Sequence, residues 1–166
     1  MDRYLTIILL AITVVLSGCA LFGGTDNLDL EHAEGLKTTA PSTWASLKKN
    51  ASDEAYKTPS GAIVTLISSC NRRHSTPLSA LTRQLLIGAR KIHYKRPPET
   101  KLIAQSEGLY SSVDGLYQNS KMHLEIFVLS RGGCVFDFTM VGPRAFEDSD
   151  LVAFNQYLES FVYDIR

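Results

Sequence analysis

The alternation of apolar and polar positions predicts a β-hairpin in the first half of the chain. Residues 55–58 and 62–70 are short runs rich in apolar side chains, and Pro59-Ser60-Gly61 separates them. Proline restricts φ and glycine tolerates positive φ, so this tripeptide suits a tight reversal. We therefore expect two antiparallel strands, the second of which ends at Cys70.

A helical spacing follows the hairpin. Thr76 is the candidate N-cap, and Pro77 suits the first helical position. Apolar residues then recur at intervals of three and four positions, at Leu78, Leu81, Leu85, Ala89 and Ile92. Because Pro97-Pro98 cannot continue a helix, we expect it to end before them. Arg83 and Arg90 would then share its polar side.

The second half of the chain predicts an antiparallel meander and a final helix. The expected strands cover residues 102–107, 109–117, 122–130 and 134–141. The third is apolar on both faces, as in a central strand. Acidic residues at 147–150 are typical of a helix N-terminus. The apolar stripe of that helix would consist of Leu151, Phe154, Leu158, Phe161 and Val162.

This element order predicts the α+β class, with an antiparallel sheet of about six strands packed with two main helices. Residues 19–40 lack sustained periodicity, which indicates a flexible tether before a single domain at 41–166. Trp44, the only tryptophan, is expected to anchor the core or an edge of this domain.

The N-terminus reads as an export signal. Residues 5–16 are mostly apolar and follow a single arginine, and they are fewer than the ~20 residues that span a bilayer. Leu16-Ser17-Gly18-Cys19 then resembles the bacterial lipobox, which implies a signal peptide at 1–18 and a Cys19 carrying diacylglycerol and acyl chains such as palmitate. Two alternatives are an ordinary secretory signal with an incidental cysteine and an N-terminal membrane anchor.

Such a lipid anchor would hold the domain on a membrane that the chain does not span. In the lipoproteins that this segment resembles, a residue after the cysteine other than Asp, here Ala20, favours the outer membrane with the domain facing the periplasm. The inner membrane and the cell surface are the alternatives.

The chain has three cysteines, so Cys70 and Cys134 remain as a pair once Cys19 is assigned to the lipid. In an oxidising compartment we expect them to form a disulfide, which would stabilise the fold by about 4 kcal/mol. The alternative is two buried free thiols. A metal site is disfavoured because the sequence has no CxxC motif and no cluster of His and Cys.

Seventeen basic and seventeen acidic residues balance, which gives no reason to expect nucleic acid as a partner. The basic residues nevertheless gather between positions 71 and 101. A candidate face for anionic ligands consists of Arg72, Arg73, Arg83, Arg90, Lys91, Lys95 and Arg96. It would bind anionic headgroups or an acidic protein partner. The alternative is a solvated face paired with the protein's own acids.

Known catalytic motifs are absent from the sequence: it has no GxSxG, HExxH, GxxxxGK[ST] or GxGxxG. His32, His74, His93 and His123 form no helical pair. We therefore expect no enzyme, no cofactor and no metal. Asp137, inside an apolar run, is either a buried acid or base, or a carboxylate on the solvent face or beside an arginine.

The element order, the early Pro41-Ser42-Thr43-Trp44 and the closing segment 154–161 resemble the PsbP-like fold over residues 41–164. The chain is also similar to a group of bacterial envelope lipoproteins with no catalytic assignment. The shared features are Ser69-Cys70 after a glycine turn, a leucine-rich helix at 78–86, and the strand start at 133–137.

The PsbP-like resemblance implies a non-catalytic binding or assembly module, and the lipoprotein group adds no catalytic assignment. A second hypothesis is an accessory lipoprotein of a lipid or substrate transport system that binds an anionic lipid, and an envelope hydrolase is disfavoured. An apolar cavity between sheet and helices would favour the transport hypothesis, and a filled core would favour the assembly module.

Overall fold

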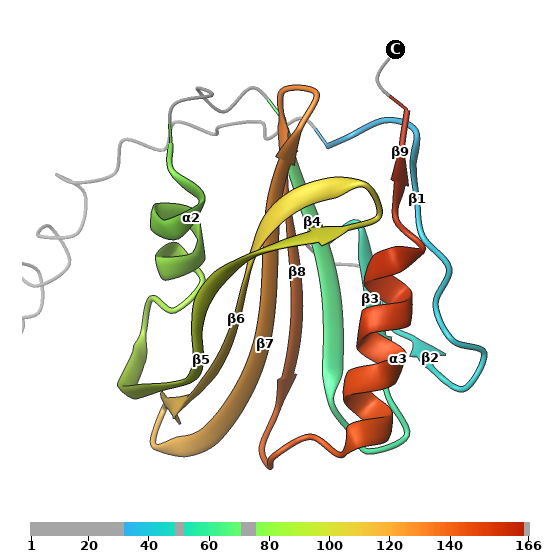
Figure 1. Cartoon of the computed structure of the whole chain (residues 1–166). Coiled ribbons are helices and arrows are strands. Elements are labelled where there is room, and N and C mark those ends of the chain that lie inside the picture. The colour runs from blue at the N-terminus through green and yellow to red at the C-terminus, as the bar shows by residue number, and fades with distance from the viewer. Residues whose placement is uncertain (1–31, 49–51, 71–75, 165–166) are drawn as a thin grey trace, which may run out of the picture.

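The computed structural model describes residues 32–48, 52–70 and 76–164. The main element of the fold is a seven-stranded antiparallel sheet with the order β2-β3-β4-β8-β7-β6-β5 (Figure 1). In chain order its strands are β2 (Ala45–Ser46), β3 (Glu54–Lys57), β4 (Ile63–Cys70), β5 (Ala89–Ile103), β6 (Ser106–Tyr117), β7 (Ser120–Arg131) and β8 (Cys134–Gly142). The other elements are α2 (Leu78–Gln84), α3 (Asp148–Glu159) and a two-stranded sheet of β1 (Leu36–Lys37) and β9 (Val162–Tyr163). The α+β prediction is confirmed.

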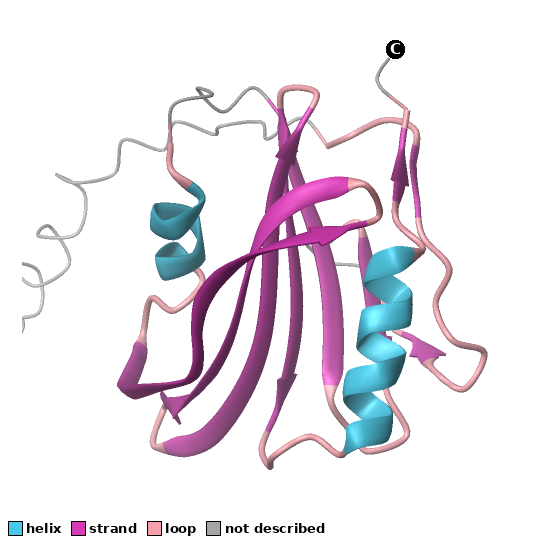
Figure 2. Ribbon diagram, viewed as in Figure 1, coloured by secondary structure: helices cyan, strands magenta, loops and turns pink. Residues whose placement is uncertain are grey.

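Two-residue turns connect the long strands β5 to β8. Both residues of each turn have positive φ: Ala104 and Gln105, Gln118 and Asn119, and Gly132 and Gly133. Turns of this kind match the twist of antiparallel strands. They produce the predicted meander, but the strand expected at 102–107 is wrong, because residues 104–105 are the turn between β5 and β6. The β5–β6 hairpin arches across the sheet toward α3 (Figures 1 and 2). There the backbone N–H of Ala104 donates to Oε2 of Glu159.

The two helices cover opposite faces of the sheet. Alternate residues of one strand face opposite sides, so Phe127 and Leu129 of β7 belong to the core under α3, whereas Ile126 and Val128 belong to the core under α2. The predicted central strand is thus confirmed. The α3 core is filled with aromatic rings, such as Phe136 and Phe161 with their centroids 5.0 Å apart.

The helix α3 begins as its acidic N-terminus predicts, with Glu147 as N-cap and Asp150 completing a capping box. Its buried stripe differs from the prediction. The helix ends at Glu159, so Phe161 and Val162 lie beyond it, and Val162 is 48% exposed in β9; Leu151 is only partly buried. Tyr157, which the stripe omitted, is fully buried. Trp44 is buried against it, as expected of a core anchor, with ring centroids 5.4 Å apart.

The long helix predicted from residue 77 onward is wrong beyond its first two turns. α2 has only seven residues, Pro77 rather than Thr76 is its N-cap, and Gly88 with φ of 87° leads the chain into β5. Arg90, Lys91, Lys95 and Arg96 therefore lie on a strand. Pro97-Pro98 fits there because β5 is an edge strand and its pairing with β6 is irregular between Arg96 and Glu99.

The tether prediction is also wrong for the part of it that the structure describes. Residues 36–37 form β1, which pairs with β9. The hydroxyl of Thr38 donates to Oε2 of Glu54, at 2.6 Å, and the backbone N–H of Ala33 donates to Ser68. Polar contacts at long sequence separation hold this segment on the domain, so local periodicity did not reveal it.

Oε2 of Glu54 also accepts hydrogen bonds from two tyrosine hydroxyl groups. Tyr56 donates to it at 2.9 Å and Tyr157 at 3.0 Å. Burial, reinforced by the hydrogen bond and the charge of Glu54, raises the pKa of Tyr56 to about 12. The same surroundings raise the pKa of Tyr157 still further above its ordinary value. The carboxylate thus fastens the N-terminal segment, β3 and α3 through protonated hydroxyl groups.

The predicted disulfide is present between Cys70 and Cys134. These residues are directly opposite each other where β4 and β8 pair, with Cα atoms 4.0 Å apart. The bond closes a separation of 64 residues and joins the hairpin to the end of the meander. Cys19, Arg72, Arg73, His74 and the signal segment lie outside the described residues.

We predict that alkaline pH destabilises the fold through Tyr56. Its pKa is higher in the folded chain than its ordinary value of 10.0, so deprotonation favours the unfolded state. The stabilisation is complete below pH 10 and is lost as the pH rises toward 12. Urea unfolding at pH 9 to 12 should show a steeper loss for wild type than for Tyr56→Phe. Identical pH dependence in both proteins would contradict this role.

Removal of the disulfide should destabilise the domain by about 3–4 kcal/mol, because the unfolded chain regains the entropy of a long loop. The measurement is urea unfolding of the Cys70→Ala/Cys134→Ala double variant beside oxidised wild type. Wild type in reducing agent is the control and should resemble the variant. Equal unfolding midpoints in all three samples would show that the bond adds no stability.

Candidate functional site

An open apolar groove of about 500 Å³ lies on the α2 side of the sheet. Its walls come from the bottom of β4, β7 and β8 and from the segment that links α2 to β5 (Figure 1). The apolar side chains that line it are Ile63, Ile67, Leu85, Ile87, Ala89, Tyr117, Met122, Leu124, Val141 and Pro143. It is more apolar than the two other hollows described below.

The groove exists because α2 is short. Leu81 and Leu86 pack on Val113, Leu124 and neighbouring residues of β6, β7 and β8. The seven-residue helix does not reach the part of β4 and β8 where Ile63 lies opposite Val141. The apolar side of these central strands is therefore left partly open, although sheets usually bury such a surface.

The rim of the groove carries large apolar side chains in water. Ile87 is 77% exposed and Tyr117 is 50% exposed. Only three of the lining side chains are polar: Ser120, Lys121 and Thr139. The hydroxyl of Thr139 already shares a hydrogen bond of 2.7 Å with that of Thr65. The groove thus offers hydrophobic contact and few polar partners.

The predicted basic face is divided among several places. Arg83 stays on α2, where its Nε donates to the carbonyl of Ser79. Arg90 lies on β5 and donates to Oδ1 of Asn119, and Lys91 is exposed at an irregularity of that strand. Arg90 and Lys121 are in one cross-strand row, on either side of Leu116.

Lys95 and Arg96 are placed elsewhere, at the edge of a polar pocket of about 300 Å³ on the α3 side. Lys95 forms an ion pair with Asp114 at 3.4 Å, and Arg96 one with Glu99 at 3.9 Å. Lys95 and Arg96 therefore pair with acidic residues of the protein itself, which is the alternative that the sequence analysis gave for the basic face.

The floor of the polar pocket contains a buried carboxylate. Oε2 of Glu125 accepts a hydrogen bond from Tyr110 at 2.8 Å, and Oε1 accepts one from Ser112 at 2.6 Å. Burial, with the nearby charge of Glu125, raises the pKa of Tyr110 well above its ordinary value. Nδ1 of His123 contacts Oδ1 of Asp114 in the neighbouring row.

These contacts do not form a nucleophile with its base. Ser112 donates to Glu125, and His123 is paired with Asp114, so the serine and the histidine have different partners. His93 is exposed in the same row as Asp114, and His32 pairs with Asp53. No group of three metal-ligating side chains occurs in ranges 32–48, 52–70 and 76–164.

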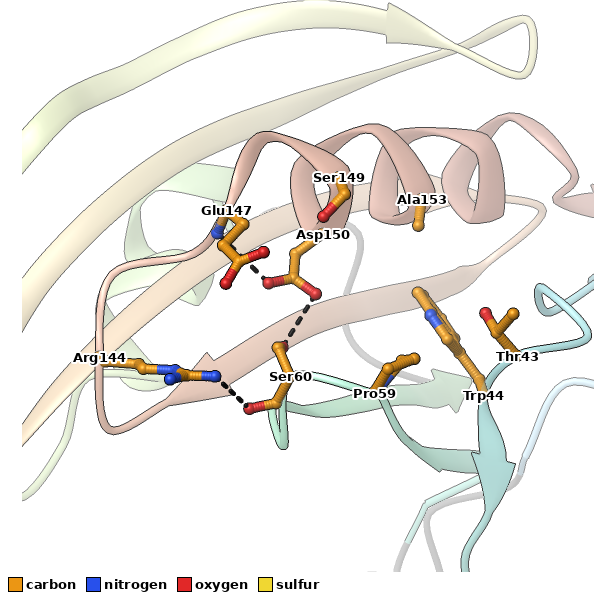
Figure 3. Close-up of a pocket in the computed structure, with 9 residues that line it drawn as sticks. All are labelled: Thr43, Trp44, Pro59, Ser60, Arg144, Glu147, Ser149, Asp150 and Ala153. Carbon is orange, nitrogen blue, oxygen red and sulfur yellow. Dashed lines mark hydrogen bonds between the residues drawn. The ribbon is translucent and has the colours of Figure 1, made fainter.

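A third hollow, of about 350 Å³, lies at the N-terminus of α3 (Figure 3). Ser60 donates to Oδ1 of Asp150, whose other oxygen accepts the backbone N–H of Glu147. Arg144 donates to the carbonyl of Ser60. The polar groups of this hollow therefore close the first turn of the helix and tie it to the β3–β4 turn.

Asp137 is buried, with 8% of it exposed, so a place on the solvent face is wrong. It stands in β8 between Ile67 and Val128, and both neighbouring strands lie inside the sheet. Its side chain is on the α2 side of the sheet, the side of Val135 and Thr139, which are two positions away along β8.

Sequence patterns missed both the groove and the polar pocket. Each brings together residues from three or more elements, and the cross-strand rows depend on register. Ile87 beside Gly88 was the available sequence signal, and the structure leaves that side chain 77% exposed at the rim of the groove.

Comparison with known proteins defines the fold. No family model matches the chain, and no curated protein sequence matches it. A cyanobacterial PsbP (CyanoP) from Synechocystis sp. PCC 6803 superimposes with a TM-score of 0.57 at 13% identity, over 78% of this chain and 87% of that one. The chain therefore has the PsbP-like fold that its sequence resembles.

Two other solved structures have the same fold. LpqN of Mycobacterium tuberculosis, described as involved in cell envelope biogenesis, has a TM-score of 0.54 at 10% identity, over 76% of this chain and 81% of that one. A Bacteroides thetaiotaomicron protein has a TM-score of 0.55 at 10% identity over 81% of this chain. The match spans only 47% of that protein's length.

Proposed function

We propose that this chain is a lipid-anchored, non-catalytic binding module of the bacterial cell envelope, and that its apolar groove binds the acyl chain of a lipid. The observation that carries the proposal is the open groove of about 500 Å³ beside α2. That volume lies within the range of small-molecule sites, ~300–1,000 Å³. Covering Ile87 and Tyr117 would remove apolar surface from water.

The lack of polar partners favours a hydrocarbon chain over a peptide. β4, β7 and β8 each pair with a strand on both sides, so their ladders use the backbone groups beneath the groove. A peptide bound there would bury amide groups without hydrogen bonds, at a cost of ~1–3 kcal/mol each. An acyl chain has no such groups. The groove therefore fits the alkyl part of a lipid.

The rim supplies charge for the headgroup. Lys121 is the basic residue among those that line the groove. Each cation near an anionic surface contributes on the order of 1 kcal/mol. An anionic lipid satisfies both the apolar walls and this rim.

Anchoring rests on the lipobox resemblance at Leu16-Ser17-Gly18-Cys19. Neither helix in the part of the chain that the structure describes has the length and apolar character needed to cross a bilayer. LpqN, which shares the fold, is a protein of cell envelope biogenesis. A lipid on Cys19 at the outer membrane would keep the groove within reach of membrane lipids from the periplasmic side.

A protein-binding assembly module is the second candidate, and the filled aromatic core under α3 favours it. This module would bind a folded partner through its surface and would not need the groove. The binding of lipid monomers therefore separates the two functions.

A carboxylate at the rim of the groove should weaken lipid binding. We expect Ile87→Glu to reduce affinity for a fluorescent fatty acid at least tenfold, because the acyl chain would desolvate an unpaired charge. The variant should fold, since Ile87 is 77% exposed. Fluorescence titration measures the affinity, on protein carrying Cys19→Ala so that no lipid of its own competes.

Val152→Glu is the matched control, since Val152 is 56% exposed on α3. Its affinity should equal that of the parent protein. Equal affinities for Ile87→Glu and Val152→Glu would exclude the groove as the lipid site and would favour the assembly module.

Charge reversal at the rim should weaken binding to anionic membranes. Lys121→Glu is expected to reduce association with phosphatidylglycerol vesicles several-fold at low salt and less at high salt, because salt screens exposed charges. Vesicle co-sedimentation measures this. Lys37→Glu, on the distant strand β1, is the control. Equal losses in both proteins would indicate only a net-charge effect.

A further inference from the structure

The polar pocket on the α3 side is a second hollow, and the groove proposal does not use it. Its floor is a ladder of polar side chains on β5, β6 and β7. Arg96, Ser112 and Glu125 form one cross-strand row, and His93, Asp114 and His123 form the next. The opposite wall consists of Leu151 and Asn155 of α3 and Phe146 from the preceding loop.

Glu125 is the most unusual group in this pocket. Only 6% of it is exposed, yet its partners are two neutral hydroxyl groups, those of Tyr110 and Ser112. No cationic side chain of the described residues lies within ion-pair distance of it. Buried carboxylates are normally paired with a cation. The pocket floor therefore presents an acceptor that an ammonium group would complete.

The cations stand at the opposite edge of the pocket. Lys95 and Arg96 are about half exposed, and their distances to Asp114 and Glu99 are 3.4 and 3.9 Å. Exposed ion pairs of this kind contribute little energy, so their cations can turn to another anion at small cost. Arg96 and Glu125 are separated by one strand, which places their Cα atoms roughly 10 Å apart.

We propose that this pocket binds a small zwitterion of the amino-acid class. The ammonium group of the ligand binds Glu125, and its carboxylate binds Arg96 and Lys95. Phe146 and Leu151 contact the side chain of the ligand. The volume of about 300 Å³ is at the small end of ligand sites, which suits a single amino acid.

Charge complementarity excludes simpler ions. A simple cation would bind Glu125 but would face Lys95 and Arg96 across the pocket. A simple anion would bind those two residues but would face Glu125 and Asp114. A zwitterion places each of its charges beside a group of the opposite sign. It also leaves the net charge of the pocket unchanged.

The test is calorimetric titration of the full chain with each standard amino acid. At least one should bind. Its N-acetyl derivative lacks the ammonium group and its amide lacks the carboxylate, so both should bind at least tenfold more weakly. Glu125→Gln and Arg96→Gln should each reduce affinity for the amino acid tenfold or more without changing fatty-acid binding in the groove.

Glu107→Gln is the matched control, because Glu107 is exposed on the same strand as Ser112 and lies outside the pocket. It should bind as wild type does. Arg96→Gln keeps the test decisive if Glu125→Gln fails to fold, since Arg96 is half exposed. Absence of heat with every amino acid, or wild-type affinity in the two pocket variants, would overturn the proposal whatever the groove binds.

Discussion

The pairing of β4 with β8 is the constraint on which the rest of the structure depends. It joins strands that are distant in sequence, over eight registered positions from Ile63 opposite Val141 to Cys70 opposite Cys134, where the disulfide fixes it. Because side chains alternate along a strand, this register decides what each face contains. Phe136 and Phe138 point into the core under α3. Thr139 and Val141 point into the groove.

The unequal helices then make the two faces different. α3 has twelve residues and buries Phe154, Tyr157 and Leu158 over the aromatic face, whereas the seven residues of α2 cover only part of the other face. The filled face stabilises the fold, and the partly covered face provides the groove. The β5–β6 hairpin curves toward α3 (Figure 1). The polar pocket lies between these strands, β7 and α3, beside the aromatic core.

Local patterns predicted the hairpin, most of the meander and α3, because each depends on turns, caps or neighbours in sequence, and the cysteine count predicted the disulfide. They failed for α2. Ala89 and Ile92 continue a helical spacing, but Gly88 breaks the helix and the edge position of β5 tolerates Pro97-Pro98. Contacts made at long range were beyond local patterns as well: β1 with β9, the hydroxyl groups on Glu54, and the cross-strand rows of the polar pocket. The cluster of basic residues in the sequence therefore predicted a local positive charge, but not where each basic side chain lies in the fold.

Groove and polar pocket share one strand, and this explains why register must be held so firmly. Leu124 of β7 lines the groove, and the next residue, Glu125, is on the floor of the polar pocket. A slip of one residue would place a carboxylate in the apolar groove and a leucine in the polar row. Turns of two residues on both sides of β7, together with the disulfide at the start of β8 beside the second turn, leave no length for such a slip. The features that stabilise this sheet are therefore the same ones that keep its two binding surfaces chemically distinct.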